Sequence, residues 1–240
     1  MQIKVCGMRD ADNIHAVSQL GVDMIGFIFY PESPRYVRMI SSNAGLMPDY
    51  SEQRYNAVCG QASKNTAPCT ESWQGSYVGV FVDDMPQNII SRIYNYNLDY
   101  VQLHGNESVV MIDNLRRSVD PDIKPGLKII KAISVEKPED IDKYKSYEGH
   151  VDLFLFDTKC ATVGGSGEQF DWSVLSRYDG NTPFLLSGGI GPDDAERVLA
   201  FHHPKCIGID LNSKFETAPA VKDVEALQVF LAACKKKLQS

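Results

Sequence analysis

The stretch VDLFLFDTKCATVGGSG, residues 151–167, decides the fold predicted for this chain. An apolar run ends in Asp157, and the loop after it contains Gly164, Gly165 and Gly167. The run is typical of a buried strand, and a glycine-rich loop can turn its backbone N–H groups toward an anion. The stretch therefore predicts a strand that delivers a carboxylate to its C-terminal end beside an anion-binding loop, which is the layout of an active site.

Similar strand-like segments recur along the chain, and helical segments separate them. The predicted strands are residues 2–5, 22–30, 77–82, 100–103, 127–133, 151–157, 183–186 and 206–211. The predicted helices are residues 10–20, 109–117, 137–147, 192–200 and 221–238, one through Ile89, Ile90 and Ile93, and a short one after Trp172. The alternation predicts a parallel sheet, and eight units in 240 residues favour an α/β fold closed as a (β/α)8 TIM barrel.

One segment breaks the alternation. Residues 39–76 show poor helical amphipathicity, and Gly and Pro interrupt a run rich in Ser, Asn, Gln and Thr. We expect an irregular excursion in place of the second helix or extending it. Nothing in its composition demands a separate domain, so residues 1–240 are predicted to form a single barrel domain that contains 39–76 as an insertion-like segment.

The charge and hydropathy of the chain argue against two classes of partner. Lys and Arg total 24 against 31 Asp and Glu, and the formal net charge of -7 gives no electrostatic reason to expect nucleic acid or an anionic membrane. No run approaches the roughly 18 apolar residues of a membrane span. The N-terminal sequence MQIKVCGMRD lacks a secretory pattern, so we expect a cytoplasmic protein.

The cysteines are scattered along the chain at positions 6, 59, 69, 160, 206 and 234. No C-x-x-C pair or nearby histidine has the spacing of a structural zinc site. Cys59 and Cys69 share one polar segment and could pair under oxidation, but a reducing compartment favours free thiols.

Several motifs follow one another along the chain. They are KVCGMRD, GFIFYPESPRYV, VGVFVD, VQLHGNES, LFDTK, GGSGEQFDW, SGGIGPDDA and GIDLNSKFE. In this order they resemble the phosphoribosylanthranilate isomerase family of tryptophan biosynthesis, over nearly the whole chain except residues 39–76. The resemblance implies a (β/α)8 barrel that converts N-(5-phospho-β-D-ribosyl)anthranilate to 1-(2-carboxyphenylamino)-1-deoxy-D-ribulose 5-phosphate by an Amadori rearrangement. It implies no metal and no organic cofactor.

Three residues match chemical groups of that family. Cys6 matches the general base, Asp157 the general acid, and Arg35 the group that receives the anthranilate carboxylate. Cys6 stands at a strand's C-terminal end, where barrel active sites lie, although most free cysteines are simply small buried residues. Asp157 follows an apolar run and could otherwise cap a loop. Arg35 could be a solvated loop charge, but Pro31 and Pro34 restrict the backbone around it, as a loop that holds a guanidinium requires.

The reaction requires an acid and a base of this kind. Ring opening needs a proton at the furanose oxygen as the anomeric C–O bond breaks, and Asp157 is placed to supply it. A base must then remove the C2 proton of the protonated imine. The thiolate of Cys6 suits this step because nearby positive charge, from Lys4, Arg35 or the cationic intermediate, can bring its pKa near the working pH.

Substrate binding is predicted at the loops after the last strands. The phosphate is expected where backbone N–H groups and the helix that starts near Pro192 converge, at Gly165, Ser166, Gly188, Gly189, Asn212 and Ser213. His104 could shape the pocket or satisfy a backbone partner, and Asp210 is expected to orient the sugar or a loop. The family's last phosphate loop usually runs Ser-Ser-Gly, whereas here Lys214 replaces the glycine, either aiding phosphate binding or facing solvent.

Other functions fit parts of this pattern. A sugar-phosphate epimerase would need metal ligands grouped on strand ends, and the related histidine-pathway isomerase uses an aspartate where this chain has Cys6. A barrel that binds a phosphosugar as a sensor or scaffold would need neither an acid nor a base. We therefore expect a small-molecule phosphosugar substrate, and a monomer or homodimer.

Overall fold

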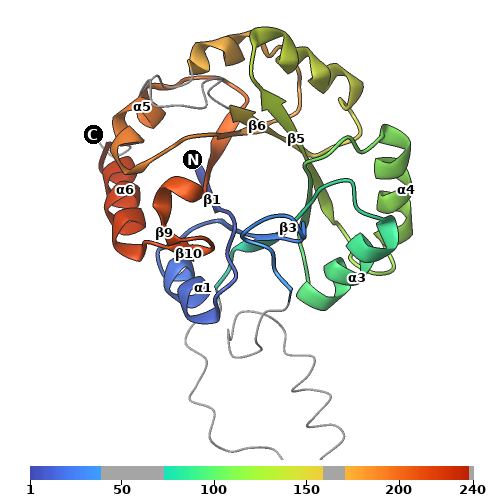
Figure 1. Ribbon diagram of the computed structural model, residues 1–240. Helices are drawn as coiled ribbons and strands as arrows, with labels where there is room; N and C mark the ends of the chain where they lie inside the picture. Colours follow the sequence, from blue (N-terminus) through green and yellow to red (C-terminus); the bar gives the residue numbers. More distant parts are fainter. Residues whose placement is uncertain (39–72, 159–170, 238–240) are drawn as a thin grey trace, which may run out of the picture.

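The computed structural model describes residues 1–38, 73–158 and 171–237, and within them parallel strands close into a barrel (Figure 1). Each strand pairs with the next, and the last pairs with the first. The eight predicted strands are confirmed, and their ends differ from the predicted ones by no more than two residues. They are β1 (Gln2–Val5), β2 (Met24–Ile28), β3 (Ser76–Phe81), β4 (Tyr100–Leu103), β5 (Lys128–Val135), β6 (Leu153–Thr158), β7 (Phe184–Ser187) and β8 (Cys206–Leu211).

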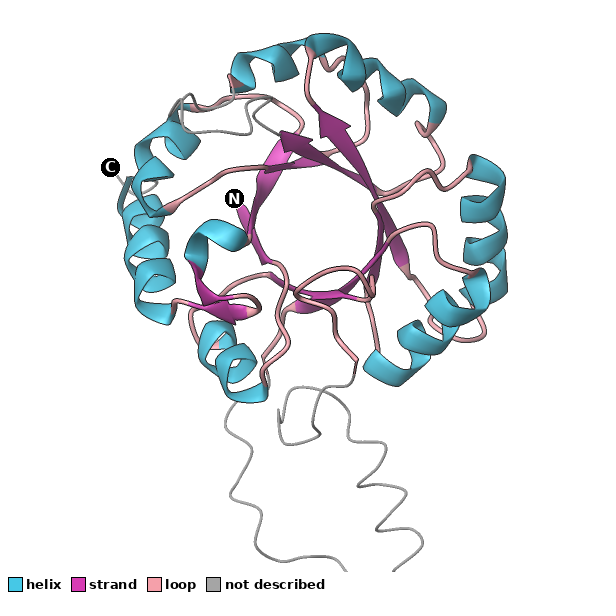
Figure 2. Cartoon of the chain, in the orientation of Figure 1, coloured by secondary structure: helices cyan, strands magenta, loops and turns pink. Residues whose placement is uncertain are grey.

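Helices surround the barrel on its outer side (Figure 2). The α-helices are α1 (Ala11–Ser18), α3 (Pro86–Tyr96), α4 (Val109–Val119), α5 (Ala195–Ala200) and α6 (Val224–Lys237). The 3₁₀ helices are η2 (Pro138–Ser146), η3 (Trp172–Arg177), η4 (Pro192–Asp194) and η5 (Ser213–Phe215). Local sequence sets several of their starts: the Asp10 and Ser108 side chains, for example, accept backbone N–H groups at the first turns of α1 and α4.

Some of the predicted helices differ from the structure in type or in their first residue. Residues 137–147 were expected to be α-helical but contain the 3₁₀ helix η2, whose buried Ile141 and Tyr144 have the spacing of about three residues per turn. The helix predicted from position 221 begins instead at Val224, because Val221–Lys222 form the strand β10, antiparallel to β9 (Glu216–Ala218). The Asn13 amide fixes β10 by exchanging hydrogen bonds with the backbone of Lys222.

The hydrophobic core has an inner and an outer part. A large cluster fills the space between the strands and the helices, and a smaller one fills the barrel. The smaller cluster comprises Met24, Val78, Ile130, Ala132, Leu153, Leu155 and Leu185. Because side chains alternate along a strand, Asp157 follows Leu153 and Leu155 on the inner face of β6. The apolar interior of the barrel therefore forms the floor beneath this carboxylate.

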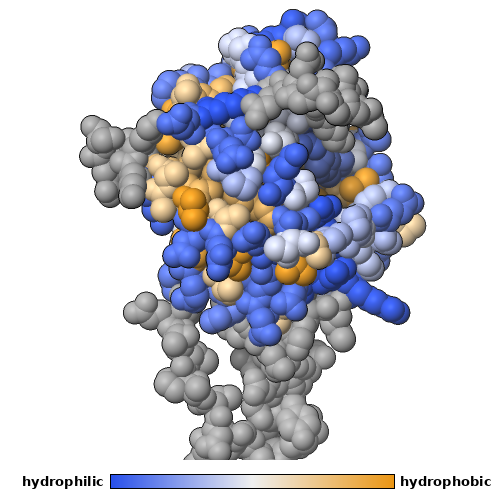
Figure 3. Space-filling view, turned by 60° about the vertical axis from the view of Figure 1, so that its left-hand side comes forward, coloured by the Kyte–Doolittle hydropathy of each residue, from blue (hydrophilic) through white to orange (hydrophobic). Residues whose placement is uncertain are grey.

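The surface turned forward in Figure 3 is mostly hydrophilic, with hydrophobic side chains gathered in one part of it. Across the described ranges, no helix is both long and apolar enough to span a bilayer. The predicted excursion at residues 39–76 lies outside the described residues up to position 72. At its end, the indole N–H of Trp73 donates to the carbonyl of Val22 at 3.1 Å, and Ser76 already belongs to β3.

Candidate active site

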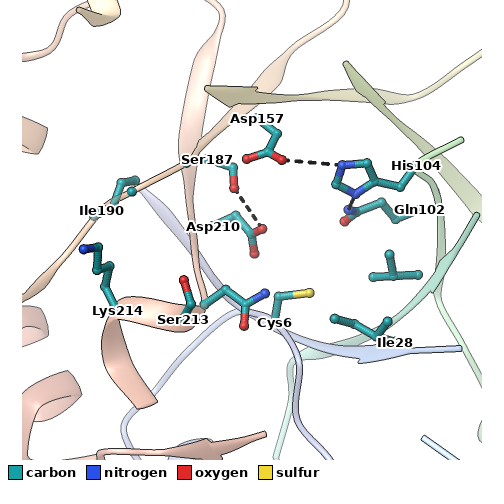
Figure 4. Close-up of a pocket in the computed structure, with 14 residues that line it drawn as sticks. Cys6, Ile28, Gln102, His104, Asp157, Ser187, Ile190, Asp210, Ser213 and Lys214 are labelled. Atoms are coloured by element: carbon teal, nitrogen blue, oxygen red, sulfur yellow. Dashed lines mark hydrogen bonds and ion pairs between the residues drawn. The ribbon is translucent and has the colours of Figure 1, made fainter. Parts of the chain in front are cut away.

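A pocket of about 240 Å³ lies at the C-terminal end of the barrel. The structure brings most of the predicted site residues together here, from strand ends that are far apart in the sequence (Figure 4). The predicted residues that line it are Cys6, His104, Asp157, Gly188, Gly189, Asp210, Asn212 and Ser213. Gly165 and Ser166 lie outside the described residues. Across the described ranges, no three His, Cys, Asp or Glu side chains gather as a metal site would require.

Cys6 follows the last residue of β1, and its sulfur points into the pocket (Figure 4). The residue is only 3 % exposed. A Cβ atom at Gly26, on the neighbouring strand β2, would lie 2.8 Å from the Cys6 Sγ, so a glycine there leaves the room that the thiol occupies. Burial raises the pKa of the Cys6 thiol above its ordinary value, while the positive charge of Lys4 acts to lower it.

Lys4 and Asp210 form a buried ion pair beneath this thiol. The two residues are direct partners in the pairing of β1 with β8, and the Lys4 Nζ lies 2.8 Å from the Asp210 Oδ1. The Ser187 hydroxyl donates to the other carboxylate oxygen at 3.2 Å. Burial alone would lower the pKa of Lys4, but the negative charges of Asp210 and of an ionised Cys6 raise it above its ordinary value. The pocket therefore has a buried cation close to Cys6.

Asp157 reaches the pocket from β6 and faces His104, which follows β4. The His104 Nε2 lies 3.5 Å from the Asp157 Oδ2 (Figure 4). On its other side, the His104 Nδ1 lies 3.3 Å from the amide nitrogen of Gln102. Asp157 and Cys6 are thus on strands separated by β7 and β8, and both side chains line the same cavity.

Arg35 lies outside the lining of this pocket. Its Nε and Nη2 bind the carboxylate of Glu216 in a bidentate pair, at 2.8 and 2.6 Å, and Lys222 binds the same carboxylate at 2.5 Å. Lys222 also donates to the Asn212 side-chain oxygen at 2.8 Å, which links this cluster to the pocket. Burial would raise the pKa of Glu216, but the hydrogen bonds from Arg35 and Lys222 outweigh it and lower that pKa.

The predicted phosphate loops lie together at the ends of β7 and β8. Gly188 and Gly189 both adopt positive φ angles, +100° and +68°, and Ser213 begins the short helix η5. The sequence left the role of Lys214 open between phosphate binding and a charge that faces solvent. In the structure Lys214 lines the same pocket, and the residue is exposed. At the helix start near Pro192, the N–H of Gly191 donates to the Asp194 carboxylate at 2.7 Å.

Sequence reasoning missed several residues of the site. Those that line the pocket are Ile28, Val80, Gln102, Ser187 and Ile190. Gln102 could have been found, because it lies two positions before His104 and side chains two apart share one face of a strand. The same spacing relates Cys6 to Lys4, which the sequence already suggested as a positive charge near the thiol. Glu216 and Lys222 had no comparable signal, because their partner Arg35 is remote in the sequence.

Comparisons with known proteins show which family this chain resembles. A family model described as N-(5'phosphoribosyl)anthranilate (PRA) isomerase matches residues 45–233. The N-(5'-phosphoribosyl)anthranilate isomerase of Parabacteroides distasonis is 43 % identical over 231 residues, which cover 96 % of this chain and 92 % of the relative. That of Phocaeicola vulgatus is 39 % identical over 239 residues and all of both chains.

A solved structure extends the similarity to the fold. It shows monomers generated from the dimeric phosphoribosylanthranilate isomerase of Thermotoga maritima, with 25 % sequence identity, a TM-score of 0.68 and coverage of 98 % of each chain. The barrel, the ordered motifs and the full-length relatives lead to the same conclusion. The chain belongs to the family of N-(5'-phosphoribosyl)anthranilate isomerases, enzymes of tryptophan biosynthesis.

Proposed function

We propose that this isomerase works in the cytoplasm by an acid and base pair, with Asp157 as the general acid and Cys6 as the general base. Its substrate is N-(5-phosphoribosyl)anthranilate, and its product is 1-(2-carboxyphenylamino)-1-deoxyribulose 5-phosphate. The observation that carries the proposal is that both side chains line one pocket at the C-terminal end of the barrel. A protein that only bound a phosphosugar would need neither group there.

The first step opens the furanose ring. The Asp157 carboxyl group gives its proton to the ring oxygen, the C1–O bond breaks, and the lone pair of the substrate nitrogen forms a protonated C=N bond. Asp157 is held at the end of β6, where His104 faces one of its oxygens at 3.5 Å. Hydrogen bonds in free active sites are often long and shorten when substrate binds.

The second step moves a proton from carbon to sulfur. The Cys6 thiolate removes the C2 proton, and the electrons of that C–H bond form a C1–C2 double bond while the C=N electrons return to nitrogen. Tautomerisation of the resulting enol, with a proton added at C1, gives the ketone. The Lys4 ammonium lowers the pKa of this thiol, so it favours the thiolate that the step requires.

The pocket has a polar and an apolar side that suit the two ends of the substrate. Gly188, Gly189, Ser213 and Lys214 lie at the ends of β7 and β8, where the phosphate is proposed to bind, with Asn212 beside them. Gly165 and Ser166 stay predicted members of that site. His104 and Asp210 are proposed to contact the ribose between the two ends.

The anthranilate end is proposed to lie toward the apolar side chains of Ile28 and Val80. Glu216 occupies only the Nε and Nη2 edge of Arg35. The remaining N–H groups of the guanidinium include Nη1, so they can receive the anthranilate carboxylate. The chain is proposed to be a monomer or a homodimer.

Turnover of freshly generated substrate tests the proposal. The loss of anthranilate-type fluorescence measures the rate, and NMR of the product distinguishes the ketose from its isomer, the unreacted aminoaldose. We expect steady turnover by the unmodified protein. Saturable binding of the substrate with no turnover would contradict the proposal and favour a phosphosugar sensor.

A further inference from the structure

Gln102 has a carboxamide that the proposed mechanism does not yet use. It lies on β4 opposite Val80 of β3, is 2 % exposed and lines the pocket next to His104 (Figure 4). Its amide nitrogen lies 3.3 Å from the His104 Nδ1. Its amide oxygen is buried and has no hydrogen-bond partner among the described residues.

The contact with His104 fixes the state of the imidazole ring. An amide nitrogen can only donate a hydrogen bond, so the His104 Nδ1 must accept it. A neutral imidazole that accepts at Nδ1 carries its proton on Nε2. That nitrogen faces the Asp157 Oδ2 at 3.5 Å, so Gln102 directs a donor toward the proposed general acid.

The unpartnered oxygen points to a second contact. Buried polar atoms are nearly always hydrogen-bonded, and the exceptions often have a functional reason. Four such atoms occur within the described ranges, on Gln2, Gln102, Glu148 and Trp172. Of these residues, Gln102 is the one that lines the active-site pocket. The structure therefore places an unsatisfied acceptor beside the cavity that the substrate must fill.

We propose that Gln102 is a positioning residue for the isomerisation, with one contact on each side of its carboxamide. Its NH₂ group holds His104 in the tautomer that presents Nε2–H to Asp157. Its oxygen accepts a hydrogen bond from an N–H or O–H group of the bound phosphosugar. The inference rests on the proposed function, because it assumes that Asp157 acts on substrate in this pocket.

A pair of matched glutamine variants tests the contact with substrate. Gln102→Met keeps the length of the side chain and removes both hydrogen-bonding groups. We expect kcat/KM to fall by about tenfold or more, because a buried hydrogen bond to the substrate is lost. Gln2→Met is the control: its oxygen is also buried and unpartnered, but Gln2 begins β1 at the opposite end of the barrel. Its kcat/KM should stay within about twofold of the unmodified value.

Nitrogen NMR of the histidine side chains tests the contact with His104. The signals of His104 are identified by their loss in His104→Asn. In the unmodified protein they should show a proton on Nε2, and in Gln102→Met a mixture of tautomers. Gln102→Glu keeps an acceptor but loses the donor when ionised, so the proton should move to Nδ1.

Two results would overturn the inference. One is a proton on Nδ1 of His104 in the unmodified protein. The other is a folded Gln102→Met protein whose kcat/KM stays within about twofold of the unmodified value. Both differ from a failure of the proposed function, which would appear as an unmodified protein without turnover.

Discussion

The Arg35 guanidinium and the Glu216 carboxylate, 181 residues apart in sequence, meet in a bidentate ion pair with its shortest contact at 2.6 Å. Glu216 is the first residue of β9, and Lys222 of β10 binds the same carboxylate. The small β9–β10 hairpin lies beside α1 and α6 in Figure 1. Through Glu216 it holds the Arg35 side chain, which comes from the loop after β2. Because the pair fixes one edge of the guanidinium, the other edge is oriented before substrate arrives.

Removing this carboxylate should weaken both the fold and substrate binding. Glu216→Gln leaves the fully buried Lys222 ammonium without its counter-charge, and breaking a buried pair in this way costs about 3 kcal/mol of unfolding free energy, measured in urea. KM should rise, by about tenfold, because Arg35 is no longer held. Asp142→Asn is the control, since it removes ion pairs with Arg177 and Lys145 on the exposed surface, and its urea midpoint should hardly change. Equal shifts of the urea midpoint in Glu216→Gln and Asp142→Asn would contradict this role of the buried pair.

The pH dependence of kcat/KM should change when the charges around Cys6 are removed. Burial raises the pKa of this thiol, and the reaction needs the thiolate, so kcat/KM should rise as the pH increases into the alkaline range. Lys4 lowers that pKa and Asp210 raises it. In Lys4→Met the rising limb should therefore move to higher pH, and in Asp210→Asn to lower pH. Limbs that stay in place, or that move in the same direction in both variants, would show that Cys6 is not the titrating base.

How far the sequence predicts this structure can be judged from particular residues. The barrel follows from the alternation of apolar strands and helices. The positions of Cys6 and Asp157 follow from local patterns too, because both residues lie at the ends of apolar strands. Gln102 was missed although it shares a strand face with His104, two positions away, whereas Lys4 was expected as one of several possible positive charges near Cys6. The Arg35, Glu216 and Lys222 cluster was beyond prediction, since it depends on how the β9–β10 hairpin packs against a remote loop. Monomer or homodimer stays a prediction.

The two glycines of the loop after β7 should differ in their tolerance of a side chain. In Gly188→Ala the new Cβ would lie 1.9 Å from the backbone oxygen of Thr158, and its φ of +100° is strained. Gly189→Ala meets no atom within 4 Å and carries only the strain of its φ of +68°, about 1–2 kcal/mol. Urea unfolding should show a clearly larger loss for Gly188→Ala. A similar loss in both variants would contradict the close approach of this loop to β6.

Lys214 should strengthen phosphate binding. It lines the pocket where the family usually has glycine, and its ammonium would meet a phosphate at the ends of β7 and β8. Lys214→Gly should raise KM about three- to tenfold with little change in kcat, and it should weaken the dependence of KM on salt. Lys205→Gln is the matched control, because Lys205 precedes β8 at the other end of the barrel and donates to the carbonyl of Asn181. A KM for Lys214→Gly equal to that of the control would mean that Lys214 faces solvent.

The most direct test of the central claim is the turnover of freshly generated N-(5-phosphoribosyl)anthranilate by the unmodified protein, Cys6→Ser and Asp157→Asn, followed by fluorescence under identical conditions. Both side chains line one pocket, and the account gives each a proton transfer that the other cannot perform. It predicts that kcat falls by about a hundredfold or more in each variant while the fold is retained. Turnover by either folded variant within about tenfold of the unmodified rate would contradict the pairing of Cys6 and Asp157 as base and acid.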